Sequence, residues 1–154
     1  MMIRATQVLS RYVSIDQVSR IVRAKHSGSD AVRHVQLIDV RSTAEVAATG
    51  LIPSAVNIPL PVLRDVLDEA GVLDEAEFES VFGAARPVRG VTQIVFYCAH
   101  GVRSAIACDV AEELGFENAG NFSGSWAQWH YTYGAVDSPE KAPHISPIAP
   151  TRDT

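Results

Sequence analysis

The chain has 154 residues, of which 47% are hydrophobic and 20% charged, so it is long enough for one domain with a sizeable core, and global disorder is excluded. Its 18 acidic residues outnumber its 13 basic ones, which argues against nucleic acid as a partner, because phosphate binding needs a basic face. No apolar run approaches the roughly 18 residues of a membrane span, so no membrane partner is expected. Two cysteines are too few for a disulfide framework, which favours a reducing compartment inside the cell.

The two ends of the chain differ from its middle. Residues 1–14 contain Arg4 and Arg11 and no acidic residue, a balance that fits a mitochondrial presequence and equally fits an ordinary basic N-terminus. The expected compartment therefore stays open between cytoplasm and mitochondrion. Four prolines in the last 18 residues predict an irregular tail. We expect an N-terminal extension at residues 1–11, one folded domain at 12–136 and a proline-rich tail at 137–154.

In chain order, the first half of the domain predicts helices and short strands in alternation. Ser14 with Gln17 and Ser42 with Glu45 form two capping boxes, so each serine is expected to begin a helix. Short apolar runs predict buried strands, and two acid-rich stretches keep helical spacing. The expected strands are Val35–Val40 and Ala55–Ile58. One helix is expected from Ser14 to about Lys25, a second from Ser42 to Gly50, and two more at Val62–Ala70 and Asp74–Phe82.

The second half contains the clearest strand. Gln93–Cys98 is apolar and rich in β-branched and aromatic residues, which predicts a central strand. In the helix expected next, Ile106, Val110 and Leu114 have the spacing of a buried stripe. Strands that alternate with helices predict an α/β fold with a parallel sheet covered on both faces. The remaining expected elements are a turn at Ala99–Val102, a helix at Arg103–Leu114, a strand at Asn118–Phe122 and a closing helix at Trp126–Tyr133.

Cys98 lies where such a fold binds its ligand. Sites of parallel α/β sheets lie at the carboxyl ends of the strands, and Cys98 ends a strand just before a turn and a helix N-terminus. Converging N–H groups and the helix dipole stabilise a thiolate there, and Arg103 adds a permanent cation. The alternative is a buried thiol that only fills space. The grouping of Cys98, Gly101, Arg103 and Ser104 favours a functional loop.

At this point the chain resembles the single-domain rhodanese-like sulfurtransferases, over about residues 12–130. Two positions depart from the usual family pattern: Leu51 replaces a frequent histidine, and Ser54 a frequent glycine. Neither departure lies in the cysteine loop. The segments that carry the resemblance are Leu37–Arg41 followed by Glu45, Gly50–Pro59, Cys98–Ser104 and Asn121–Trp126.

The resemblance implies a three-layer α/β/α fold with a five-stranded parallel sheet, in which Cys98 carries a persulfide. It also implies that Arg103 binds the anionic sulfur donor at the loop mouth. Asp39 and Arg41 are expected to support the loop through hydrogen bonds, with plain capping and an ion pair to Glu45 as the alternative. The expected substrate-binding loop consists of Ala99, His100, Gly101, Val102, Arg103 and Ser104.

Single residues of the loop can be assigned from their types. Gly101 is expected to adopt a positive φ angle so that successive N–H groups converge. Ser104 either caps the helix or donates its hydroxyl toward the sulfur. His100 is expected to face solvent, where its charge can tune the donor preference. Cys108, ten residues after Cys98, is expected to be structural, as are Trp126 and Trp129.

The expected reaction is transfer of a sulfane sulfur from thiosulfate or a persulfide, through Cys98, to a thiol or cyanide acceptor. One alternative is a phosphatase or arsenate reductase of the same fold, but in those relatives five residues separate cysteine from arginine, whereas four do here. Two others are a non-catalytic binding module and a carrier that hands sulfur to a protein acceptor. Scattered histidines and the lack of a Gly-rich nucleotide loop predict no metal and no cofactor.

Overall fold

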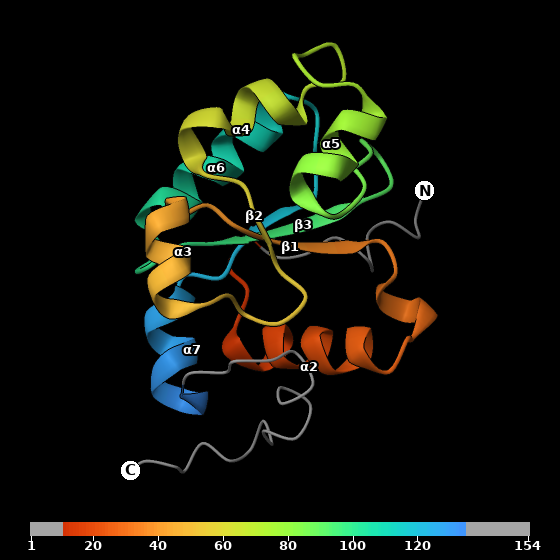
Figure 1. The fold of residues 1–154 in the computed structure, drawn as a ribbon. Coiled ribbons are helices and arrows are strands. Elements are labelled where there is room, and N and C mark those ends of the chain that lie inside the picture. Colours follow the sequence, from red (N-terminus) through yellow and green to blue (C-terminus); the bar gives the residue numbers. More distant parts are fainter. Residues whose placement is uncertain (1–10, 135–154) are drawn as a thin grey trace.

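The computed structural model describes residues 11–134, and it is drawn in Figure 1. The expected N-terminal extension (apart from Arg11) and the expected proline-rich tail lie outside the described residues. The end of the domain expected at residue 136 lies outside them too, so these boundaries stay predictions.

The centre of the fold is a parallel sheet with the strand order β2-β1-β3-β4. A fifth strand was expected, but the described residues form four. At the β4 edge, the part of the chain that the structure describes makes a single bridge, between Tyr12 and Asn121. The pairing stops there because Ser14, two residues later, already caps a helix. The strands are β1 (Val35–Asp39), β2 (Val56–Asn57), β3 (Gln93–Tyr97) and β4 (Ala119–Asn121).

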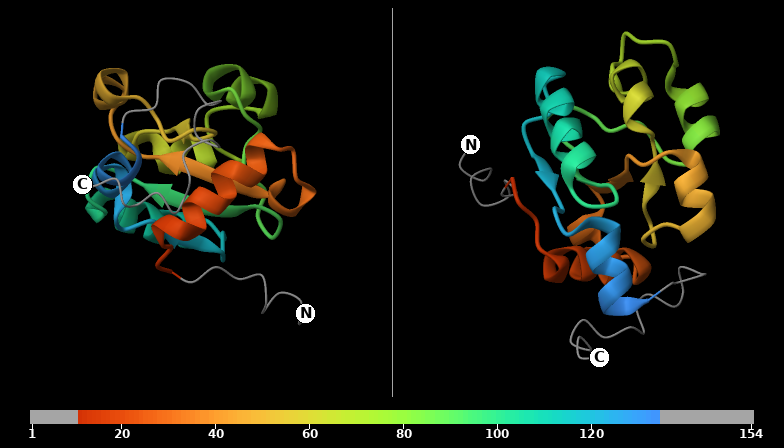
Figure 2. Two further views of the ribbon diagram at one scale, coloured as in Figure 1. Left: turned by 90° about the horizontal axis from the view of Figure 1, so that it is seen from below. Right: turned by 90° about the vertical axis from the view of Figure 1, so that its left-hand side faces the viewer.

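Helices cover both faces of the sheet, which confirms the three-layer α/β/α arrangement (Figures 1 and 2). One face packs against α2 (Ile15–His26) and α7 (Ser125–Tyr133), and the other against α4 (Leu60–Leu67), α5 (Glu75–Phe82) and α6 (Val102–Glu113). The remaining helical elements are α3 (Thr43–Thr49) and the short 3-10 turn η1 (Asp30–Val32).

The local signals of helix initiation are confirmed. Ser14 accepts a hydrogen bond from the N–H of Gln17, and Ser42 accepts one from the N–H of Glu45, with the reciprocal bond present in both boxes. Asp74 forms a third box at the start of α5. These contacts satisfy N–H groups that the first turn of a helix leaves without a partner.

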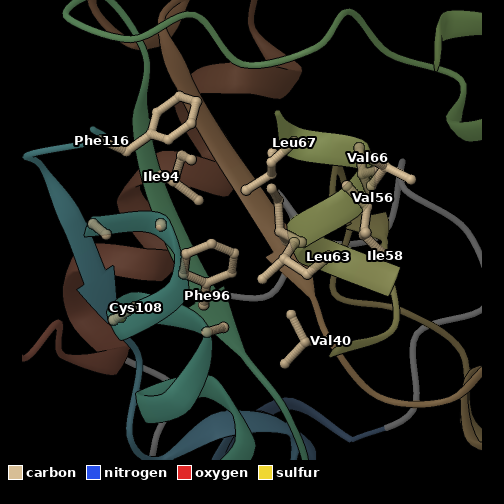
Figure 3. Close-up of a cluster of buried hydrophobic side chains, with 14 of the residues drawn as sticks. Val40, Val56, Ile58, Leu63, Val66, Leu67, Ile94, Phe96, Cys108 and Phe116 are labelled. Atoms are coloured by element: carbon tan, nitrogen blue, oxygen red, sulfur yellow. The ribbon is translucent and has the colours of Figure 1, made fainter. Parts of the chain in front are cut away.

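The expected buried stripe of α6 is wrong at Ile106, whereas Val110 and Leu114 are partly buried and pack against the core. Ile106 is 47% exposed, and the helix turns Ser104, Ala107, Cys108 and Ala111 toward the core. Figure 3 shows Cys108 among the apolar side chains on this side of the sheet. Small side chains let a helix approach its neighbours closely. A prediction based on the spacing of large apolar residues does not detect a buried face made of small ones.

Candidate active site

Cys98 follows directly after β3, at the carboxyl end of the sheet. Its carbonyl oxygen accepts a hydrogen bond from the N–H of Trp126 at 2.9 Å, and that of Ala99 accepts one from Ala127 at 3.1 Å. The N–H of Cys98 donates to the hydroxyl of Ser125 at 3.1 Å. The first turn of α7 therefore holds the beginning of the cysteine loop by its backbone.

Several donors converge on the sulfur of Cys98. The N–H of Gly101 lies 3.1 Å from Sγ, and the N–H and the hydroxyl oxygen of Ser104 both lie 3.4 Å from it. The hydroxyl of Ser125 lies 4.0 Å away on another side. A ring of donors around one atom is the arrangement that stabilises a negative charge there.

Gly101 makes this convergence attainable, as expected from the sequence. Its φ angle is +97°, and an added Cβ would lie 2.5 Å from the carbonyl oxygen of Ser123. The side-chain amide of Asn121 donates to the carbonyl oxygen of Gly101 at 3.3 Å, which holds the turn against β4. No other amino acid fits this position without moving the backbone.

The surroundings of Cys98 lower the pKa of its thiol. Burial by itself raises this pKa, since Cys98 is only 1% exposed, but hydrogen bonds from Ser104, Gly101 and His100 outweigh that effect. The thiolate is therefore favoured more than in a free cysteine.

Arg103 forms an ion pair with Glu45, a partner that was not expected from the sequence. Its two terminal nitrogens bind the two carboxylate oxygens of Glu45 at 2.7 and 3.0 Å. The same carboxylate accepts the N–H and the hydroxyl of Ser42, so the capping box of α3 fixes its position. The hydrogen bonds to Arg103, followed by that from Ser42, lower the pKa of Glu45 to about 2.

Asp39 and Arg41 form a buried ion pair at the end of β1. The Nη2 atom of Arg41 lies 2.7 Å from Oδ2 of Asp39, and the backbone N–H of Arg41 donates to the same carboxylate at 2.8 Å. The guanidinium also donates to Thr49 and Gly50 and lies 4.8 Å from the ring centroid of Trp126. The alternative ion pair of Arg41 with Glu45 is wrong, because each has another partner.

The other loop residues are placed as follows. His100 is exposed, as expected, and Val102 is exposed as well, while Ala99 is half-buried. Trp126 and Trp129 are buried in the core, in line with their expected structural role. That Ala99, His100 and Val102 bind substrate stays a prediction.

Two residues that contact the loop from other elements were missed as its partners. Ser125 bonds to the backbone of Cys98 although 27 positions separate them, and its φ angle is +56°, in the left-handed region. The place of Ser125 in the Asn121–Trp126 segment was the available signal. Glu45 was assigned to its capping box, with an ion pair to Arg41 as an alternative, and no local pattern indicates that its carboxylate reaches Arg103 on α6.

Within residues 11–134, no group of three or more potential ligand side chains could hold a metal ion. No helix in that part of the chain is long and apolar enough to cross a membrane. A hollow of about 840 Å³ lies away from Cys98, beside β2, and is bordered by Lys25, Gln36 and residues 47–56 and 82–84.

The chain is similar to curated sulfurtransferases. It is 37% identical over 97 residues to a mouse thiosulfate sulfurtransferase/rhodanese-like domain-containing protein, covering 63% of this chain and 59% of that one. It is 36% identical over 94 residues to the human thiosulfate:glutathione sulfurtransferase, covering 61% and 77%. The mitochondrial thiosulfate sulfurtransferase RDL2 of Saccharomyces cerevisiae is 32% identical over 151 residues, covering 89% and 97%. The chain thus spans about three fifths of the mouse relative and nearly all of the yeast one.

Solved structures agree with this similarity. The human single-domain sulfurtransferase TSTD1 superposes with a TM-score of 0.64 at 31% identity, covering 79% of this chain and 96% of that one. The structure of yeast RDL2 gives a TM-score of 0.65 at 30% identity, covering 83% and 94%. The family model of the rhodanese-like domain matches residues 23–132, which include β1, the Cys98 loop and all but the last residue of α7. The chain therefore belongs to the rhodanese-like domain family.

Proposed function

We propose that this chain is a sulfurtransferase that holds the transferred sulfur as a persulfide on Cys98. The observation that carries the proposal is the ring of donors from Gly101 and Ser104 around one sulfur atom. The names of the relatives, which specify thiosulfate as donor and in two cases glutathione as acceptor, support the same reaction.

In the first half of the reaction, the Cys98 thiolate attacks the outer sulfur of thiosulfate or of a persulfide. A bond forms between the two sulfurs, and the old bond breaks with its electron pair going to sulfite or to a thiolate. The outer sulfur of the new persulfide carries the negative charge, and the loop donors stabilise it. Arg103 supplies a cation at the rim, and Asp39 and Arg41 support the loop through Trp126, whose N–H binds the Cys98 carbonyl.

In the second half, an acceptor thiolate attacks the outer sulfur and leaves with it, which regenerates the Cys98 thiolate. A small thiol such as glutathione is the acceptor best supported by the relatives. Cyanide and a protein thiol are further acceptors within this proposal. Because the sulfur is held covalently between two steps, we expect ping-pong kinetics. No cofactor is needed.

The spacing of the loop favours sulfur over phosphate. Four residues separate Cys98 from Arg103, and the donors meet at the sulfur itself, which leaves little space for a tetrahedral anion. The chain should therefore show negligible hydrolysis of an aryl phosphate. A non-catalytic role is disfavoured because both Cys98 and Arg103 are present.

Intact mass after incubation with thiosulfate tests the proposal. The chain should gain the mass of one sulfur atom, and Cys98→Ser should gain nothing. A folded wild-type chain that takes up no sulfur, or a Cys98→Ser variant that still does, would contradict it. The cell compartment is proposed only as cytoplasm or mitochondrion, and the mitochondrial yeast relative supports the latter.

A further inference from the structure

The Glu45–Arg103 ion pair changes the electrostatics of the loop mouth. Arg103 is the cation expected to attract an anionic donor, but both of its terminal nitrogens already bind a carboxylate. The side chains of Arg103 and Glu45 are 37% and 39% exposed, so the pair lies at the rim rather than in the core. At the rim, one positive and one negative charge largely cancel.

Glu45 is held for this contact. Its Oε1 atom accepts the N–H and the hydroxyl of Ser42, both at 3.0 Å, in addition to Arg103. The carboxylate therefore has a second anchor besides Arg103, and with a pKa lowered to about 2, first by the hydrogen bond from Arg103, it is ionised at neutral pH. Capping alone does not require a charge, since glutamine completes a capping box equally well, as Gln17 does at α2.

The charge state of the bound donor therefore matters. A Cys98 thiolate next to a cancelled ion pair leaves the site with about one negative charge, and thiosulfate carries two more. Removing the negative charge of Glu45 should strengthen the attraction of such a dianion, while a donor without net charge should be little affected.

We propose that Glu45 is a specificity-determining residue that neutralises Arg103 at the loop mouth, so that the site disfavours dianionic sulfur donors relative to persulfides of low net charge. This inference rests on the proposed function only for the donors. The charge at the mouth can be measured without any sulfur transfer.

The test compares alkylation of Cys98 by iodoacetate, which is negatively charged, and by iodoacetamide, which is neutral. Both reagents react with the same thiolate, so the ratio of the two rates cancels changes in thiol pKa and access. Intact mass gives the rates, with Cys98→Ser as the background. Cys108 does not interfere, because burial above all raises its pKa to about 12.

In Glu45→Gln, which keeps the capping box, the iodoacetate to iodoacetamide ratio should rise about threefold, and this gain should shrink at high salt. In Arg103→Ala the ratio should fall. Glu113→Gln is the matched control, since it removes an acid that pairs with Arg64 at the other end of α6, and its ratio should stay at the wild-type value.

The second readout is the kcat/KM for thiosulfate, which should rise in Glu45→Gln. An unchanged or lower alkylation ratio in this variant overturns the inference, and so does a higher ratio combined with a lower kcat/KM, because Glu45 would then only position Arg103. If the wild-type chain takes no sulfur from thiosulfate, the proposed function fails, and the alkylation ratio alone decides the role of Glu45.

Discussion

The two cysteines of this chain are ten residues apart and equally hidden, yet their thiols differ in chemistry. Cys98 is 1% exposed and Cys108 is fully buried. Burial raises the pKa of both, but at Cys98 the donors of Ser104 and Gly101 reverse the effect, whereas at Cys108 the pKa reaches about 12. Exposure therefore does not decide which cysteine reacts. The direction of nearby N–H groups does, because they stabilise only the ionised form.

Removal of each thiol in turn tests the difference between the two cysteines most directly. Cys98→Ser should abolish sulfur uptake from thiosulfate, whereas Cys108→Ala should keep it and lose only some stability, since it leaves a small cavity in the core. Thiocyanate production and intact mass measure the first effect, and circular dichroism checks the fold. Loss of uptake in a folded Cys108→Ala variant would show that the second thiol takes part.

The next largest effect is expected at Gly101. An alanine there brings Cβ within 2.5 Å of the Ser123 carbonyl, so the turn must move and its N–H must leave the sulfur. Sulfur uptake should slow by roughly a hundredfold, as when one preorganised donor is lost. Gly90→Ala is the matched control, because Gly90 also has a positive φ angle but nothing lies within 4 Å of an added Cβ. Equal losses of activity in both variants would mean that backbone strain, not the cradle, is responsible.

The hydroxyl of Ser104 makes the largest of the contributions that lower the pKa of Cys98, so its removal tests the cause of that shift. In Ser104→Ala that pKa should rise, and alkylation at neutral pH should slow by roughly tenfold, because a hydrogen bond to a charged group contributes about 1.5 kcal/mol or more. The rate of iodoacetamide reaction as a function of pH measures the shift. Ser19→Ala, a buried helical serine on α2, controls for the loss of a hydroxyl. A pH profile identical to wild type would contradict the role of Ser104.

The smallest effect concerns stability at low pH. The ion pair with Arg103 lowers the pKa of Glu45 from 4.5 to about 2, so the folded chain favours the ionised form. The resulting stability is present above pH 4.5 and is lost as the pH falls toward 2. For a pair this exposed it amounts to less than about 1 kcal/mol. In urea unfolding, wild type should be more stable than Glu45→Gln at pH 6, and the difference should shrink at pH 3. A difference independent of pH would point to another cause.

Local sequence signals predicted much of the fold and the centre of the site. Two capping boxes and one strand are confirmed: the boxes at Ser14 and Ser42 and the strand before Cys98. Each depends on residues that are close together in the sequence. The positive φ angle of Gly101 also follows from the turn itself. Among residues 11–134 the fifth strand is reduced to one bridge at Tyr12, since the helix capped by Ser14 begins two residues later.

The amino-acid sequence is enough to identify the candidate nucleophile and to place it after a strand and before a glycine turn, because these features depend on neighbours in the chain. The tertiary structure sets the partners that come from other elements. Ser125 meets Cys98 from 27 positions away, and Glu45 meets Arg103 from 58. It also decided that small residues, not Ile106, form the buried face of α6. Such contacts depend on how the helices pack around the sheet, and the spacing of residues along one element carries no information about the element that packs against it.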